Sequence, residues 1–209
     1  MNNPNKVIWH HSNGTGRNAS ASTQHHDVYV IDGHHKTLWP GFTSKRYKNS
    51  KTGEYFHCGY HFVIDVTQQK ITQTRALYEE GAHCIGKNRS SIGVLIIGNY
   101  DKGVDKLPEE ANQLIYKVWQ KIKQVYPELV IADNVPHRKY ATKSCYGNGL
   151  SDTFIQTIIK ENSQRNELVV DNMSEQDKAI FAKIVDRLER VVSKLTQIVS
   201  RRRLSLREK

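Results

Sequence analysis

The uninterrupted apolar segment SIGVLIIG, residues 91–98, restricts the fold more than any other part of the sequence. A run of this kind is typical of a strand that is buried on both faces. Further segments with the composition of strands lie at 6–10 (KVIWH), 59–65 (GYHFVID) and 70–73 (KITQ), and the last two are close enough in sequence to form a hairpin. The sequence therefore predicts a central sheet built from these segments.

Helical patterns follow the apolar segment. Apolar residues recur at three- and four-residue spacing from Pro108 to residue 125, so a helix is expected to begin at Pro108 and to pack on the sheet. Residues 129–132 (LVIA) are expected to form a short strand, and 153–159 a closing helix. Strands that alternate with helices predict an α/β domain, with a mixed central β-sheet flanked by helices, over residues 1–161.

Two segments near the strands have weaker signals. Residues 27–38 fit either a helix or an irregular segment, because a β-prone VYVI run lies between polar flanks. Residues 43–54 are polar and rich in Lys, and they are expected to form an exposed excursion. In the strand that follows, Tyr60, Phe62 and Ile64 are expected to share one face.

The C-terminal part is expected to be separate from this domain. Residues 162–173 are polar and are expected to form a linker, and a helix is expected over 174–209 with Ser174 as its N-cap. Residues 186–209 hold eight Lys/Arg against three Asp/Glu. Apolar residues of this helix follow the 4, 3, 4, 3 spacing of a coiled-coil seam; they are Ile184, Leu188, Val191, Leu195 and Ile198.

This basic amphipathic tail allows three interpretations. It can be an oligomerising coiled coil, a helix that packs on its own domain, or a cationic helix that binds anionic envelope or membrane surfaces. The cluster Arg201-Arg202-Arg203, with Leu204 and Leu206 beside it, favours envelope binding combined with weak self-association.

The charge balance predicts a polyanionic partner. The 31 Lys+Arg against 21 Asp+Glu give a net charge of +10, which attracts nucleic acid, an anionic membrane or an acidic cell wall. The sequence contains no nucleic-acid-binding motif, so no specific nucleic acid is predicted as a partner. No segment approaches the roughly 18 apolar residues of a membrane-spanning helix, and the start, MNNPNK, lacks the apolar run of a secretory signal.

The three cysteines are an odd number in a chain without an export signal, so a disulfide framework is not expected. Cys58 and Cys84 are expected to be buried or inert thiols, and their pairing is left open.

Cys145 belongs to a possible metal site. His137 lies eight residues before it, at an expected strand end, and His10 ends a strand that can lie beside theirs. Zinc prefers imidazole and thiolate, and a catalytic site takes three protein ligands. The spacing is not that of a zinc finger.

His11 is expected on the opposite face of its strand, and it replaces His10 as ligand only if the register is shifted.

Five motifs in a fixed order resemble the zinc-dependent N-acetylmuramoyl-L-alanine amidases, a family that includes phage amidase-type lysozymes and peptidoglycan recognition proteins. The resemblance covers residues 6 to about 160. The motifs are VIWHHS at 7–12, GYHFVI at 59–64, GAHCIGKN at 81–88, SIGVLIIG at 91–98, and His137 followed by KSC at 143–145.

Carried over residue by residue, the resemblance implies a zinc ion held by His10, His137 and Cys145, with Tyr60 and Lys143 as the catalytic pair. In this family, the resemblance implies that active enzymes have a thiolate ligand at this position and that members which only recognise peptidoglycan lack it. Zinc lowers the pKa of its water toward about 7 and polarises the substrate carbonyl. Lys143 precedes a predicted ligand by two residues, so it is expected to donate to the oxyanion. The Tyr60 phenol can hydrogen-bond the water, help to transfer its proton or stabilise the oxyanion, and we assign it the orientation of water and aid in proton transfer.

Other residues of these motifs have open roles. His83 and Asn88 are expected either to bind substrate in the cleft or to support their own loop, and His61 is expected to be packed or hydrogen-bonded. The sequence departs from the family pattern at an insertion, 43–57, and at Tyr146, where proline is usual. The remaining histidines are expected at the surface: His25, His26, His34, His35 and His57.

The implied activity is hydrolysis of the amide bond between the lactyl group of N-acetylmuramic acid and L-alanine in peptidoglycan, with cell wall degradation and antimicrobial bacteriolysis as the outcome. The simplest expectation is a phage endolysin, made in the host cytoplasm and acting on the wall after release. An exported autolysin or a cytoplasmic recycling enzyme shares this chemistry. The alternative is a non-catalytic recognition module, against which the retention of Cys145, Tyr60 and Lys143 argues.

Overall fold

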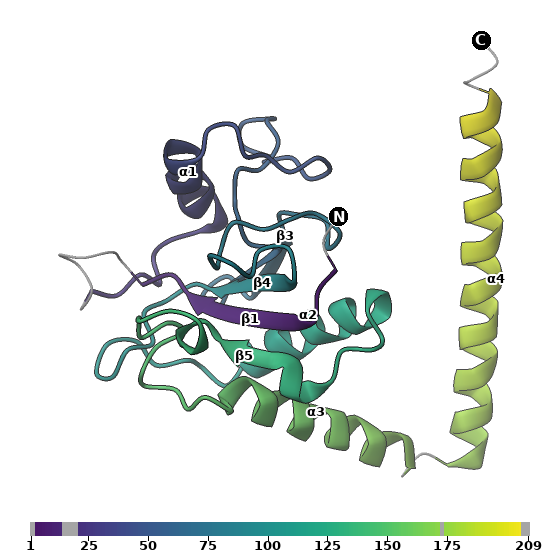
Figure 1. The fold of residues 1–209 in the computed structure, drawn as a ribbon. Helices are drawn as coiled ribbons and strands as arrows, with labels where there is room; N and C mark the ends of the chain where they lie inside the picture. Colours follow the sequence, from purple (N-terminus) through teal and green to yellow (C-terminus); the bar gives the residue numbers. More distant parts are fainter. Residues whose placement is uncertain (1–2, 14–20, 172–173, 206–209) are drawn as a thin grey trace. The chain divides into compact units, whose positions relative to one another are not determined.

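A computed structural model of the chain describes residues 3–13, 21–171 and 174–205 (Figure 1). Contacts between residues divide the chain into two compact units, Met1–Asn162 and Ser163–Lys209. This division lies next to the domain limit expected at residue 161, and the functional meaning of the two parts stays a prediction.

The first unit is built around one sheet with the strand order β3-β2-β4-β1-β5. β3 is antiparallel to β2, and the other neighbours are parallel, so the predicted mixed sheet is confirmed. The apolar segment forms β4 at the centre, where every residue of the strand is buried. The strands are β1 (Lys6–His11), β2 (Phe62–Asp65), β3 (Lys70–Gln73), β4 (Ser91–Ile96) and β5 (Asn134–Pro136).

Helices cover both faces of this sheet (Figure 1). α2 (Ala111–Val125) and α3 (Phe154–Asp171) contribute to the larger core, in which Ile115 and Ile159 pack in one cluster with Val94 of β4. α1 (Val28–Leu38) packs on the opposite face, where Leu95 of β4 lies in one cluster with Ile31. Each fully buried aliphatic side chain contributes about 1.5–3 kcal/mol. The alternation of buried side chains along β4 therefore supports a three-layer α/β fold.

Residues 27–38, whose sequence fits either a helix or an irregular segment, contain the helix α1. The Asp27 carboxylate accepts hydrogen bonds from the backbone N–H groups of Tyr29 and Val30, both at 2.9 Å, and so acts as the N-cap. Val28 and Ile31 are buried one helical turn apart. The β-prone residues are therefore helical because a cap and an apolar face outweigh their intrinsic preference.

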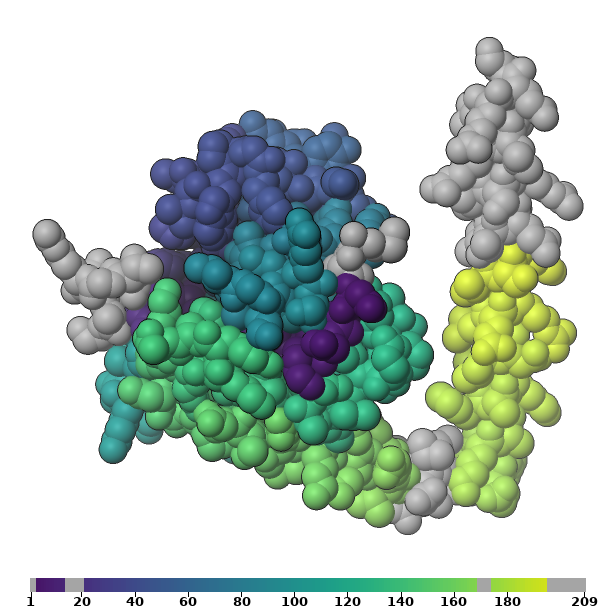
Figure 2. Space-filling view, viewed as in Figure 1, coloured from purple at the N-terminus to yellow at the C-terminus, as the bar shows by residue number. Residues whose placement is uncertain are grey.

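The N-terminal segment is bound to parts of the chain that are distant in sequence. In the space-filling view, the first described residues, in dark purple, lie between teal and green segments of the first unit (Figure 2). Asn3 N–H donates to the carbonyl of Arg89, 3.1 Å, and the Lys6 ammonium pairs with Asp133. These contacts fix the start of β1, the strand that carries His10.

The prediction of a strand at residues 129–132 is wrong. Val130 is exposed, and Ile131–Asp133 form the 3-10 turn η2 before β5 begins at Asn134. The Asp133 carboxylate accepts a hydrogen bond from Val130 N–H, 2.8 Å. This local bond competes with strand pairing, which accounts for the turn.

The predicted start of the α2 helix also differs from the structure. The chain makes a turn at Pro108, whose carbonyl accepts from Ala111 N–H at 3.0 Å, and the helix begins at Ala111.

The linker predicted at 162–173 is helical as far as Asp171, because α3 continues through it. The segment contains neither Gly nor Pro, so nothing in its sequence ends the helix. Asn162 binds α3 to α2, since its amide oxygen accepts from Gln113 Nε2 at 2.6 Å. Residues 172 and 173 of the predicted linker lie outside the described residues.

Two further details differ from expectation near β2. Tyr60 precedes the strand and packs in the cluster that contains Val63, whereas Phe62 and Ile64 face the larger core. Tyr60 therefore does not share a face with Phe62 and Ile64.

The excursion at 43–54 is partly buried. Ser44 and Asn49 are buried because carboxylates elsewhere in the fold accept their hydrogen bonds: Ser44 Oγ donates to Glu79, 3.0 Å, and Asn49 Nδ2 donates to Asp32, 2.6 Å. The polar residues of this segment therefore anchor it to the first unit.

The second unit contains the helix α4 (Glu175–Ser205), which confirms the predicted C-terminal helix. Ser174 is its N-cap, because Ser174 Oγ accepts from Asp177 N–H at 3.1 Å. Among the described residues, no helix is long and apolar enough to cross a membrane. Leu195 and Ile198 of the predicted seam lie outside the described side chains. The exposed apolar residues of α4 are Ile180, Phe181, Ile184, Val185, Leu188, Val191 and Val192.

Candidate metal centre

His10 and His137 come from neighbouring parallel strands. Trp9 of β1 is paired with Pro136 of β5, and both strands run in the same direction. His10, near the end of β1, and His137, directly after β5, therefore lie at the carboxyl ends of these strands, which is where α/β folds place their sites. The two imidazole rings lie side by side, with centroids 4.4 Å apart.

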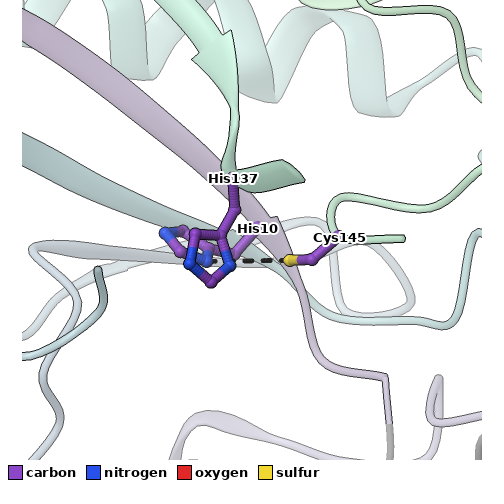
Figure 3. A group of neighbouring side chains, drawn as sticks. All are labelled: His10, His137 and Cys145. Atoms are coloured by element: carbon purple, nitrogen blue, oxygen red, sulfur yellow. Dashed lines mark hydrogen bonds between the residues drawn. The ribbon is translucent and has the colours of Figure 1, made fainter. Parts of the chain in front are cut away.

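Cys145 completes a group of three donor residues. One donor atom from each of His10, His137 and Cys145 lies within 4.8 Å of the other two, and this is the one such group found in the described part of the chain. His10 Nδ1 is 3.7 Å from Cys145 Sγ, and Figure 3 shows the thiol directed toward the two rings. The structure thus brings together all three predicted metal ligands.

The donor set fits zinc in type and in spacing. Zinc bonds of about 2.0–2.1 Å to nitrogen and about 2.3 Å to sulfur, at tetrahedral angles, hold a nitrogen and a sulfur ligand about 3.5–3.6 Å apart. The distance of 3.7 Å between His10 Nδ1 and Cys145 Sγ is close to this separation. Two imidazoles and a thiolate also favour zinc over harder divalent ions such as magnesium.

Burial sets the protonation of these groups. It lowers the pKa of His10 well below its usual value, and the neighbouring His83 and His137 lower it further. The pKa of His137 falls to about 4, mainly through burial and also through the charge of Lys143. Burial raises the pKa of Cys145 to about 12. At neutral pH the imidazoles are therefore neutral and ready to bind a metal, whereas the thiol must lose a proton.

Arg138 holds the loop that carries Cys145. Its guanidinium donates to the backbone carbonyls of Gly147 and Leu150, each at 2.7 Å. Its backbone N–H donates to the carbonyl of Cys145, 2.6 Å. Arg138 was not predicted from the sequence, although its place directly after a predicted ligand is a signal that could have identified it.

Asp101 supports the same loop from the segment after β4. One carboxylate oxygen accepts from Ser144 Oγ and the other from Asn148 N–H, both at 2.9 Å. The sequence contains no signal for this role, because the residues are more than 40 positions apart.

The sequence profile of the N-acetylmuramoyl-L-alanine amidase family (Amidase_2) matches residues 1–148, which is more than half of the chain and includes all three donor residues. The chain belongs to this family. No curated protein sequence matches the chain significantly.

Solved structures share the amidase fold. An N-acetylmuramoyl-L-alanine amidase, LysC from Clostridium intestinale URNW, has a TM-score of 0.56 at 19% identity over 76% of this chain and 87% of that one. The Ph2119 endolysin, from a Thermus scotoductus bacteriophage, has a TM-score of 0.54 at 16% identity, over 76% of this chain and 86% of that one. A mutant of Drosophila PGRP-LB in complex with tracheal cytotoxin has a TM-score of 0.50 at 19% identity, over 72% of this chain and 79% of that one. Identities this low show the fold alone.

Tyr60, one of the predicted catalytic pair in this amidase, lies beside the donor group. Its ring packs edge-on against His10, with centroids 5.0 Å apart. Burial raises the pKa of its phenol, and the neighbouring Cys145 raises it further. The hydroxyl is therefore protonated at neutral pH and able to donate a hydrogen bond. Its catalytic role stays a prediction.

Lys143, the other member of the pair, is exposed in the loop two residues before Cys145. Its positive charge lowers the pKa of both His137 and Cys145. The ammonium group therefore acts electrostatically on two of the three donors, and its role toward an oxyanion stays a prediction.

His11 points away from the donor group. Its Nδ1 accepts a hydrogen bond from Tyr100 N–H, 3.0 Å, while its backbone N–H donates to Cys145 Sγ, 3.4 Å. The alternation of side chains along β1 thus selects His10 for the donor group, as expected for an unshifted register.

His83 and Asn88 lie together in the loop before β4. His83 Nδ1 is 3.1 Å from His10 Nε2, and Asn88 Oδ1 accepts from the backbone N–H of His83, 2.9 Å. His83 thus contacts a predicted ligand on β1 and Asn88 supports the loop, and their predicted contact with substrate stays a prediction.

The other histidines and cysteines lie outside the donor group. His61 is buried and bonded to the carbonyl of Glu79, as expected. The prediction of a surface position is wrong for His35 and His57, which are buried. His35 is buried because its Nδ1 accepts from the backbone N–H of Gly59, 2.8 Å. Free thiols are found at Cys58, Cys84 and Cys145.

Proposed function

We propose that this protein is a zinc-dependent amidase that cleaves the bond between the lactyl group of N-acetylmuramic acid and the L-alanine of peptidoglycan. Its family membership supports hydrolysis of a peptidoglycan amide. The observation that carries the proposal is the group of His10, His137 and Cys145, whose donor atoms lie within 4.8 Å of one another. These three residues hold the zinc ion.

Each protein group near the metal has a defined task. Bound zinc supplies Lewis-acid activation of water and of the scissile carbonyl. The Tyr60 hydroxyl, protonated through its raised pKa, orients the attacking water and aids proton transfer. The Lys143 ammonium donates to the oxygen that gains negative charge, at the exposed mouth of the site. The loop that carries His83 and Asn88 is proposed to line the cleft that receives the muropeptide.

Product identification tests the reaction. Purified peptidoglycan is incubated with zinc-loaded protein, with the Cys145→Ser variant, and with a chelated sample, and the products are identified by mass. We expect stem peptides with a free L-alanine N-terminus from the first sample alone. Products from cleavage of the glycan or of a cross-link would contradict the proposal.

A recognition module is the second candidate function. The PGRP-LB structure shows that this fold occurs in a peptidoglycan recognition protein, in complex with tracheal cytotoxin. Binding alone does not require a thiolate beside two imidazoles, so the donor group favours the enzyme. Retention of peptidoglycan by zinc-loaded protein without any cleavage would support the module instead.

We further propose that the protein is a phage endolysin with antimicrobial, bacteriolytic action, made in the host cytoplasm and acting on the wall after release. The Ph2119 protein, named an endolysin, shares its fold. Bacterial cells that express the chain should grow until their membrane is permeabilised, and then lyse. Lysis without permeabilisation would indicate export, and no lysis in either case would favour a recycling enzyme.

For α4 we propose binding to an anionic membrane or envelope surface. The exposed apolar residues include Phe181, Ile184 and Leu188, which share one helical face by their three- and four-residue spacing. Lys183, Arg187 and Lys194 repeat at intervals of four and seven along one flank of this face. Basic flanks would repel each other in an antiparallel pair of such helices, whereas they complement anionic lipid headgroups.

Vesicle binding tests this surface. Wild-type protein should sediment with vesicles that contain phosphatidylglycerol and not with phosphatidylcholine vesicles. A Lys183→Gln, Arg187→Gln, Lys194→Gln variant should lose this binding while it cleaves soluble muropeptides at the wild-type rate. Dimerisation of both proteins in analytical ultracentrifugation without vesicle binding would favour self-association instead.

A further inference from the structure

The two ring nitrogens of His10 face different partners. Nδ1 faces Cys145 Sγ at 3.7 Å, on the side of the donor group. Nε2 faces away from it and lies 3.1 Å from Nδ1 of His83. A neutral histidine has one N–H donor and one acceptor nitrogen, so the partner of Nε2 decides whether Nδ1 has a free lone pair for a metal.

The neighbours of His83 determine the direction of this hydrogen bond. Ser91 Oγ donates to the carbonyl of Lys87, 2.7 Å, and therefore presents lone pairs to His83 Nε2, 3.4 Å away. His83 then carries its hydrogen on Nε2 and accepts through Nδ1. His10 must donate from Nε2, which leaves Nδ1 unprotonated on the side of Cys145.

The loop is shaped around the His83 ring. A Cβ atom added at Gly81 or at Gly93 would come within 2.5 Å of ring atoms of His83, so both glycines leave the space that the ring occupies. Asn88 Oδ1 accepts from the backbone N–H groups of His83 and Cys84, at 2.9 and 2.8 Å. These contacts fix the backbone and the ring plane together.

We propose that His83 is a positioning residue for the metal centre, which accepts the hydrogen of His10 Nε2 and thereby presents His10 Nδ1 to zinc. The inference rests on the proposed zinc site. Partners of this kind orient ligating histidines and typically contribute 10–100-fold to metal affinity.

This role differs from contact with substrate. A substrate-binding His83 would need a ring nitrogen free to meet the muropeptide, but Nδ1 faces His10 and Nε2 faces Ser91. The positioning role of His83 also explains the GAHCIGKN motif. Gly81 leaves space for the ring, His83 accepts the hydrogen bond from His10, and Asn88 fixes the loop.

Zinc affinity of metal-free protein, measured by competition with a chelator, tests the inference. We expect His83→Phe, which fills the space without an acceptor, to weaken zinc binding by about 10–100-fold. His83→Gln, whose amide oxygen can accept from His10 Nε2, should recover most of this loss. His34→Phe changes an exposed histidine and should bind as wild type does. Cobalt bound to His83→Phe should show an altered visible spectrum.

The outcomes separate the two proposals. If wild-type protein binds no zinc, the proposed function fails, and with it this inference. If wild type binds zinc and a folded His83→Phe binds within twofold with the same cobalt spectrum, the inference alone is overturned.

A measurement on wild type applies even where the variant does not fold. Nitrogen-15 NMR of the imidazoles of the metal-free protein should show hydrogen on Nε2 of both His10 and His83. Hydrogen on His83 Nδ1 would overturn the inference.

Discussion

Cys145 is the residue on which the zinc account most depends. Its thiol is paired with neutral imidazoles, and burial raises its pKa to about 12, so a metal ion must displace its proton. His137, with a pKa of about 4, is already deprotonated near neutral pH. Zinc binding should therefore release one proton, and that proton should come from Cys145.

The pH dependence of zinc affinity tests this assignment. Because metal-free Cys145 stays protonated through neutral pH, the apparent affinity should rise about tenfold per pH unit below about pH 7, where the zinc-bound water still keeps its proton. Chelator competition at each pH measures it. In Cys145→Ser the rise should be absent and the affinity lower. An affinity of the wild type that does not change with pH would show that the thiol is not a ligand.

Tyr60 offers a second test at this scale. Tyr60→Phe keeps the ring against His10 and removes only the hydroxyl, so zinc binding should be unchanged while turnover falls about 10²-fold or more. Zinc content and hydrolysis of a soluble muropeptide are measured together. Tyr78→Phe alters an exposed tyrosine and serves as the control. Full activity of zinc-loaded Tyr60→Phe would remove Tyr60 from the mechanism.

At the scale of elements, the sequence predicted what periodicity encodes. The buried strand β4 and the helix α2 follow from apolar spacing, and His10 and His137 follow from strand ends. The 3-10 turn at Ile131–Asp133 was not predictable from that pattern, because a side-chain bond from Asp133 decides it. The place of His83 depends on space left by glycines from two segments, which no local pattern reveals.

The loop that carries Cys145 provides the test at this scale. Arg138 donates to several backbone carbonyls of the loop through a planar group that lysine cannot imitate. Arg138→Lys should therefore weaken zinc binding about tenfold while it preserves the charge. Arg165→Lys, at an exposed site on α3, should have no effect. Equal zinc affinity in both variants would show that the loop is held without Arg138.

At the scale of the whole molecule, buried histidines connect the fold to pH. Burial lowers the pKa of His11, His35 and His61 to about 4 from an unfolded value near 6.5. The unfolded chain thus binds more protons in this window, so the stabilising contribution is present above pH 6.5 and is lost as pH falls toward 4. Each such histidine lowers the free energy of unfolding by up to about 3 kcal/mol at pH 4, relative to neutral pH.

Urea denaturation of metal-free protein measures this effect. The free energy of unfolding should fall steeply between pH 6.5 and pH 4. His61→Gln should reduce the slope by removing one buried titrating group, whereas His34→Gln, at an exposed position, should leave it unchanged. A free energy of unfolding that is constant over this range would contradict the assigned protonation states.

The most direct test of the account is the coordination of zinc itself. X-ray absorption at the zinc edge of metal-loaded protein counts the ligand types. The account predicts one sulfur at about 2.3 Å and two histidine nitrogens at about 2.0–2.1 Å, with the sulfur lost in Cys145→Ser. A zinc ion surrounded only by oxygen and nitrogen in the wild type would contradict the group of His10, His137 and Cys145 as the metal centre.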